Sequence, residues 1–222
     1  MRHQMRRRQS SLRTALTDAA AMLIAEKGVH AFSVAEITRR LGVAGSAPYQ
    51  HFRSRDELLA ATAAQLGRQL AKDMKGAARK ATGHAGVRAD ATEALAAAAA
   101  AYVTFIARHR VGVDLIFSAD LVRLRHPELI DAGRAVMDVL LPLSISAVGC
   151  PAAAVRLLEQ HIAAAHGLGR LYIDGFAQRG LGSIESIAAD AAQLAHVLTA
   201  AAVMAVQAED ATPSMTTTRV AS

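Results

Sequence analysis

Apolar side chains recur every three or four residues along most of this chain, in stretches rich in alanine and leucine. In the first of these stretches they form one stripe of an amphipathic helix, made of Leu12, Leu16, Ala19, Ala20, Leu23 and Ile24. Alanine is the best helix former, and β-branched residues never cluster in the alternating runs that strands require. The chain is therefore expected to be all-α.

Glycine and serine mark the ends of the first two helices. Gly28 follows the first stripe, where a helix C-cap favours a residue with a left-handed backbone. Ser33 and Glu36 then have the spacing of a capping box, in which each side chain reaches a backbone N–H of the first turn. Gly42 ends this short second helix.

The next signals predict a third short helix and a longer fourth one. The third covers residues 46–52 and has Pro48 in its first turn, where no intrahelical N–H bond is lost. Ser54 and Glu57 repeat the capping-box spacing and open the fourth helix.

A break at residues 80–86 separates a small head from a larger body. The body is expected to contain five further helices, at residues 88–109, 111–122, 127–147, 151–178 and 184–207. The total is then about nine helices. The polar tail 209–222 is expected to be disordered.

The net charge of +6 is concentrated at the N-terminus. Residues 1–58 contain ten Lys and Arg but only five Asp and Glu. A basic excess confined to one segment is typical of a module that binds a polyanion, and it also fits an ordinary solvated surface with a disordered basic tip.

Several classes of protein are excluded by what the sequence lacks. The single cysteine, Cys150, allows no internal disulfide and no cysteine-rich zinc site. The apolar run 94–107 is too short to span a bilayer, and no apolar signal-peptide stretch follows the basic start. Nucleophile-elbow, zinc-protease and phosphate-loop motifs are missing. We therefore expect a cytoplasmic protein without enzymatic activity, catalytic residues, cofactor or membrane partner.

Two short helices joined by a glycine turn, at residues 33–41 and 46–52, have the spacing of a helix-turn-helix. The string around them is LIAEKGVHAFSVAEITRRLGVAGSAPYQHFRSRDELLAA. It resembles the TetR family of bacterial transcription regulators over about residues 12–64. The resemblance implies a homodimer that binds a palindromic operator in double-stranded DNA and is released from it by a small-molecule effector, most simply as a repressor.

The resemblance also implies which residues would contact DNA. Tyr49, Arg55 and Ser33 are placed to bind phosphates. His51 either contacts phosphate or packs beneath Tyr49, and Phe52 belongs to the core. The positions that would face the bases are Ala35, Ala44, Gly45, Ser46, Ala47 and Gln50.

Most of these base-facing residues are small, which limits direct readout. Only Ser46 and Gln50 can form a hydrogen bond with a base edge, while Ala44 or Ala47 could touch a thymine methyl group. An arginine arm could supply further contacts in a narrow minor groove, or only attract phosphates without specificity. Its residues are Arg2, Arg6, Arg7 and Arg8.

The body resembles a subgroup of the family with a Trp-His-Gly signature, through the segment HIAAAHGLGRLYIDGF at residues 161–176. Ile162 stands where tryptophan is expected. In this family the last two long helices form the dimer interface, here residues 151–207. Small residues for close approach are Ala163, Ala164, Ala165, Gly167 and Gly169, and the final helix carries a stripe of Ile187, Ala191, Leu194, Leu198 and Ala202. These residues could instead pack within one subunit.

A ligand cavity is expected where a few polar or aromatic side chains lie among apolar ones. The candidates are Tyr102, Phe105, His109, Phe117, Met137, His166 and Tyr172, each of which could also be ordinary core. His161 and His166 are five residues apart and so lie off a common helix face, which disfavours a metal site.

These observations divide the chain into a DNA-binding domain at residues 1–60, a ligand-binding and dimerisation domain at 61–208 and the tail at 209–222. Two alternatives remain. One is a constitutive repressor without an effector, and the other is a protein that coats DNA without sequence preference.

Overall fold

A computed structural model of the chain describes residues 2–83, 86–110, 113–116, 118, 123, 125–175 and 182–211, with the side chains of 2–10, 113, 114 and 210 outside this description. Within these ranges every regular element is helical, which confirms the all-α prediction. The elements are α1 (Arg2–Lys27), η1 (Val29–Ala31), α2 (Val34–Leu41), η2 (Ala47–Gln50), α3 (Arg55–Ala81), α4 (Val87–His109), α5 (Val113–Ile116), α7 (Pro127–Val148), α8 (Pro151–Ile173) and α9 (Ile184–Ala211). The predicted helix at 111–122 lies largely outside the described residues, so the count of nine stays a prediction.

The glycine and serine ends predicted for the first, second and fourth helices agree with the structure, whereas α8 ends at Ile173 and not at residue 178, and α9 continues to Ala211, into the predicted tail. Gly28 follows α1 with φ of 80°, and Gly42 closes α2 in the left-handed region with φ of 65° and ψ of 28°. The Ser33 side chain accepts a hydrogen bond from the Glu36 N–H at 3.4 Å, and Ser54 accepts one from the Glu57 N–H at 3.1 Å. Each serine therefore satisfies a backbone donor that the first helical turn leaves unpaired.

The predicted third helix is wrong in type and length. In place of a helix over 46–52 the chain forms the single 3₁₀ turn η2 at Ala47–Gln50. Pro48 has no N–H, and its carbonyl accepts from both the His51 and Phe52 N–H groups at 2.9 Å. Such tight turns are typical of very short helical pieces.

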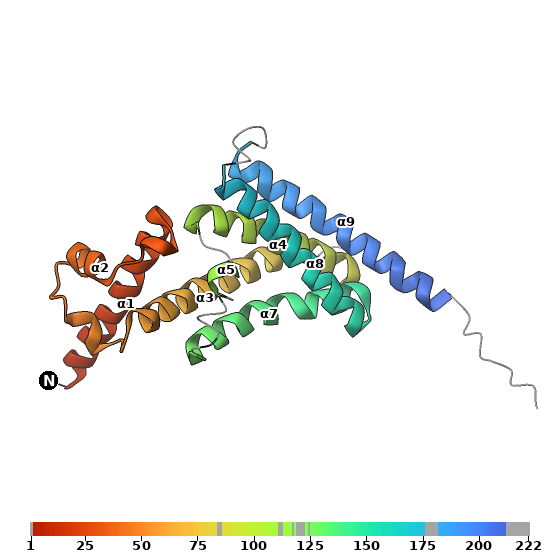
Figure 1. Cartoon of the computed structure of the whole chain (residues 1–222). Coiled ribbons are helices and arrows are strands. Elements are labelled where there is room, and N and C mark those ends of the chain that lie inside the picture. The colour runs from red at the N-terminus through yellow and green to blue at the C-terminus, as the bar shows by residue number, and fades with distance from the viewer. Residues whose placement is uncertain are drawn as a thin grey trace, which may run out of the picture.

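One long helix connects the head of the molecule to its body. In Figure 1, α3 starts beside α1 and continues between α4 and α7. The side chain of Gln65 on α3 fastens α1, because it accepts a hydrogen bond from Thr17 and donates one to Asp18. The proposed boundary between residues 60 and 61 thus falls within an uninterrupted helix.

Helix α4 is the centre of the body, where it packs against α3, α7, α8 and α9 (Figure 1). Its Leu95 and Ile106 are 1% and 0% exposed. By length and composition α4 and α9 are both apolar enough to cross a membrane, but such a test is also passed by core helices of soluble proteins. The most apolar window of α4 is 56% buried within the molecule, whereas that of α9 is only 22% buried.

Several residues expected at a dimer interface pack inside the subunit. Gly169 lies directly against α4, and Ala165 is 5% exposed. On α9, Ile187 and Ala191 are 1% and 3% exposed, so the N-terminal part of the predicted stripe also belongs to the core of the subunit. Ala163 and Gly167 do lie on the outer surface of α8.

Charged side chains fasten α2 to the end of α1. Arg40 donates to Glu26 at 2.7 Å and to Glu36 at 3.0 Å, and Arg39 donates to Glu36 at 2.9 Å. The hydrogen bonds from Arg39 and Arg40 lower the pKa of Glu36 from 4.5 to about 2. Both arginines of α2 are therefore neutralised locally, although both add to the basic excess of the head.

We expect Gly169→Ala to destabilise the protein. A Cβ at this position would lie 2.8 Å from Ile106 Cδ1 and 3.1 Å from its Cγ2, and overpacking of this kind costs about 1–3 kcal/mol. Gly76 on α3 has no atom within 4 Å of such a Cβ, so Gly76→Ala should stabilise by about 0.5–1 kcal/mol through helix propensity. Urea unfolding of both variants checks this, and equal stabilisation of the two would contradict the close packing of α8 on α4.

We expect Glu36→Gln to change how the free energy of unfolding depends on pH in acidic solution. The depressed pKa of the folded state means that the Glu36 carboxylate stabilises the protein above pH of about 4.5 and loses this contribution as the pH falls towards about 2. The unfolding midpoints of wild type and Glu36→Gln should therefore differ most above that window and converge below it. Asp138→Asn, at an exposed position of α7, serves as the control. A difference that did not change with pH would show that the charge of Glu36 is not what fastens α2.

Candidate functional site

The predicted DNA-contacting residues form an exposed surface at the end of the head. Residues 44–46, 49 and 50 are all exposed, and the Tyr49 side chain is 58% exposed although it is aromatic. Ala35 is exposed on α2, while Ser33 and Ala47 are half-buried. We call residues 44–50 the turn surface.

The turn surface rests on a buried base. Pro48 is buried between exposed neighbours, and Phe52 is 2% exposed, so Phe52 belongs to the core as predicted. The ring of the half-buried His51 lies 6.4 Å from that of Phe52, centroid to centroid. The backbone of the turn is thus held against the head while Tyr49 and Gln50 point outward.

Arg55 is exposed at the start of α3 but already has partners. Its guanidinium lies 5.1 Å from the centroid of the Phe32 ring, its Nε donates to the Phe32 carbonyl at 3.4 Å, and it pairs with Asp56 at 3.2 Å. These contacts hold the guanidinium beside the N-terminus of α2. The predicted arginine arm does not precede the first helix, because α1 already begins at Arg2. The side chains of Arg6, Arg7 and Arg8 lie outside the described residues.

Arg13 connects the base of the turn surface to the body, a role that was not predicted. Its guanidinium lies 5.1 Å from the centroid of the Phe52 ring and pairs at 2.7 Å with Glu128, at the start of α7. Arg68 on α3 lies 3.7 Å from the same carboxylate. Arg13 and Glu128 are 115 residues apart, so no local pattern could have paired them.

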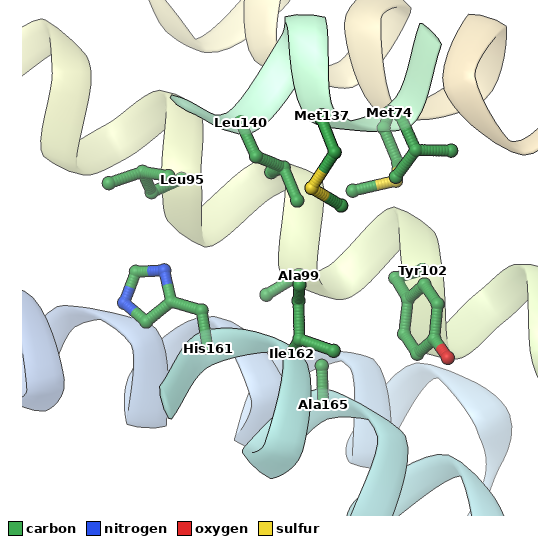
Figure 2. Close-up of a pocket in the computed structure, with 10 residues that line it drawn as sticks. Met74, Leu95, Ala99, Tyr102, Met137, Leu140, His161, Ile162 and Ala165 are labelled. Atoms are coloured by element: carbon green, nitrogen blue, oxygen red, sulfur yellow. The ribbon is translucent and has the colours of Figure 1, made fainter. Parts of the chain in front are cut away.

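A cavity lies within the body, enclosed by α3, α4, α7 and α8 (Figure 2). Its lining is apolar apart from two side chains, Tyr102 and His161. The apolar lining consists of Met74, Leu95, Ala99, Val136, Met137, Leu140, Ile162 and Ala165. The free volume is about 30 Å³, room for about two water molecules. A larger ligand would have to move the helices apart.

The predicted ligand residues fall into three groups. Tyr102 and Met137 line the cavity, and the Tyr102 hydroxyl lies 2.9 Å from Nδ1 of His166. Phe105 and His109 do not line the cavity; their rings contact each other with centroids 4.3 Å apart and a tilt of 35°, and burial lowers the pKa of His109. Tyr172 is half-buried against the core. Phe117 lies outside the described residues.

His161 lines the cavity but was not among the predicted ligand residues. Its position on the cavity wall depends on how α8 packs against α4 and α9, and the local sequence does not specify that packing. Among the described residues no group of three or more His, Cys, Asp or Glu side chains could hold a metal ion. Ile162, at the position where tryptophan was expected, also faces the cavity.

Comparison with known proteins supports the predicted family. Residues 16–62 match the family model for bacterial regulatory proteins of the tetR family. No match was found among curated proteins.

Solved structures share the whole fold. A protein with unknown function from Rhodococcus sp. RHA1 has 26% sequence identity and a TM-score of 0.67, over 84% of this chain and 94% of its own. A tetR-family regulatory protein from Rhodococcus RHA1 has 22% identity and a TM-score of 0.56, over 84% and 96%. The transcriptional regulator FadR from Bacillus subtilis, solved with stearoyl-CoA, has 16% identity and a TM-score of 0.59, over 82% and 96%. The chain therefore carries the tetR-family sequence pattern in residues 16–62 and has the fold of TetR-family regulators.

Proposed function

We propose that the protein is a transcription regulator, most simply a repressor, which binds a palindromic operator as a homodimer and is released by a small apolar ligand. The observation that carries this proposal is the turn surface, an exposed run of residues on a rigid head whose sequence matches the tetR family. Its site of action would be the cytoplasm.

In this proposal the head binds DNA chiefly through phosphates. The hydroxyl of the exposed Tyr49 donates to one phosphate, and Arg55 and Ser33 lie near the N-terminus of α2, where backbone N–H groups also favour an anion. Sequence is read by Ser46 and Gln50, with methyl contacts from Ala44 or Ala47. The arginines at residues 6–8 add contacts in the adjacent minor groove.

Dimerisation would bury the outer faces of α8 and α9. Apolar side chains there are exposed to an unusual degree, including Val155 at 46%, Leu171 at 42%, Val197 at 53% and Met204 at 69%. Two heads are also needed because one turn surface with so few base contacts discriminates weakly, and a second head on a palindrome supplies the rest.

The cavity would hold the effector. It lies in the body of a fold whose Bacillus subtilis neighbour was solved with stearoyl-CoA, and its lining is almost entirely apolar. Because its free volume is only about 30 Å³, a ligand must favour a conformation in which α7 or α8 has moved. A ligand shifts the DNA-bound state only through such a difference in affinity.

Helix α7 gives the cavity a direct connection to the head. It lines the cavity with Val136, Met137 and Leu140, and its first turn holds Arg13 through Glu128. A shift of α7 would therefore draw Arg13 away from Phe52, at the base of the turn surface. Helix α3 carries the same motion, because it lines the cavity with Met74 and starts at Arg55.

Variants of the turn surface test the DNA-binding role. Tyr49→Phe should weaken binding to every sequence by about 1 kcal/mol, roughly fivefold in Kd, because it removes one phosphate contact. Gln50→Ala should instead relax the preference at one base position. Operator sequences selected from random DNA, followed by titration at several salt concentrations, measure both effects. Tyr172→Phe makes the same chemical change in the body and should bind like wild type. Protection of DNA without sequence preference would favour the DNA-coating alternative.

Glu128→Gln should weaken the coupling between ligand and DNA. A compound that releases the wild type, found by screening apolar molecules against the operator complex, should lower operator affinity roughly 5–150-fold. In Glu128→Gln the same compound should bind as tightly but lower operator affinity severalfold less, because α7 no longer holds Arg13 by an ion pair. Asp131→Asn, one turn further along α7, removes a carboxylate whose ion pair within the described part of the chain is a local one with Arg134, and it should behave as wild type. If no compound releases the operator, the constitutive repressor is the better description.

A further inference from the structure

His161 is one of the two polar side chains on the cavity wall. It is 5% exposed, and its Nε2 lies 3.2 Å from the carbonyl oxygen of Ala195 and 3.2 Å from the hydroxyl of Thr199, both on α9. That hydroxyl donates its own hydrogen to the Ala195 carbonyl at 2.8 Å. Both contacts of His161 within the described residues are therefore made by one ring nitrogen.

These contacts determine where the imidazole proton lies. A carbonyl oxygen can only accept a hydrogen bond, so the nitrogen facing Ala195, Nε2, must carry hydrogen. Burial lowers the pKa of His161 below its ordinary value, which leaves the ring neutral at physiological pH. In a neutral imidazole with hydrogen on Nε2, the other nitrogen, Nδ1, is an acceptor.

Nδ1 has no hydrogen-bond partner among the residues that the structure describes. Figure 2 shows the His161 ring turned toward Leu95 and Leu140, on the inner side of the cavity. The other polar side chain of the lining, Tyr102, is directed to His166. An acceptor on the wall of an otherwise apolar cavity gives a ligand one place to donate a hydrogen bond, and that bond adds to the affinity of a ligand that carries a donor.

We propose that the cavity selects uncharged apolar molecules that carry one hydrogen-bond donor, such as an alcohol or an amide, and that this donor binds Nδ1 of His161. A carboxylate or ether of the same shape offers only lone pairs to this nitrogen and is rejected. The inference depends on the cavity being the effector site of the proposed function, but it concerns binding and requires no DNA.

Isomeric probes that differ only in the donor test the proposal. Matched pairs are n-hexanol with methyl pentyl ether, and cyclohexylmethanol with methoxycyclohexane. Binding to the full chain is measured by calorimetry, while nitrogen NMR of histidine-labelled protein follows the two ring nitrogens. The wild type should bind each alcohol roughly tenfold more tightly than its ether. The resonance of the unprotonated nitrogen of His161 should shift with the alcohol and not with the ether.

Two variants test whether the acceptor atom of His161, and not the shape of its ring, causes the preference for the alcohol. His161→Phe keeps a ring and should bind the alcohol and ether alike, whereas His161→Asn presents an amide oxygen near the position of Nδ1 and should retain part of the preference. His196→Phe is the control, since His196 lies beside Glu93 and not on the cavity wall. Circular dichroism confirms that each variant is folded.

Several results would overturn the inference. These are equal binding of the isomers to the wild type, binding of neither isomer, or a preference that persists in His161→Phe. Operator release is scored separately. If the alcohols bind through His161 but leave operator affinity unchanged, the ligand class stands and the sensor function fails. If alcohols and ethers release the operator equally, the sensor function stands and the inference fails.

Discussion

The burial of α4 is the constraint on which the body of this protein depends. Four helices pack around it, and its alanines allow them to approach closely because a methyl group adds little to the helix radius. Gly169 allows α8 to approach α4 in the same way, because the absence of a side chain there leaves room for Ile106. A core built from small residues excludes water through close contact between helix backbones, and it leaves unfilled space where larger side chains meet imperfectly.

The cavity occupies such a space, and the same helices that enclose it reach the head. Helix α3 is a single rigid element from Arg55 to Ala81, and α7 begins at the carboxylate that holds Arg13. In the proposed function, a displacement of the cavity walls would reach Phe52 through these packed helices and one ion pair. Packed cores have discrete arrangements, which is what a switch requires.

Buried polar groups of the body are few, and three of them have specific partners, whereas Ser144 Oγ and His126 Nδ1 have none among the described residues. His161 and Thr199 share the Ala195 carbonyl, and Tyr102 contacts His166. Because these pairs link α8 to α9 and α4 to α8, they also set how the helices are rotated about their axes. The polar side chains that line the cavity, Tyr102 and His161, are therefore the same ones that hold its helices in place.

The helices, their serine caps and the turn surface follow from the sequence, because helical periodicity, capping and turn chemistry act over fewer than about five residues. The exposure of Tyr49 and burial of Phe52 follow in the same way. Tertiary packing alone decided that the third helix is the 3₁₀ turn at Ala47–Gln50, that Ala165 and Gly169 pack inside the subunit, and that His161 lines the cavity. It also brought Arg13 to Glu128. Those outcomes depend on which helix faces pack against each other across the core. The periodicity of a sequence identifies the apolar face of a helix, but it does not specify which other helix that face contacts.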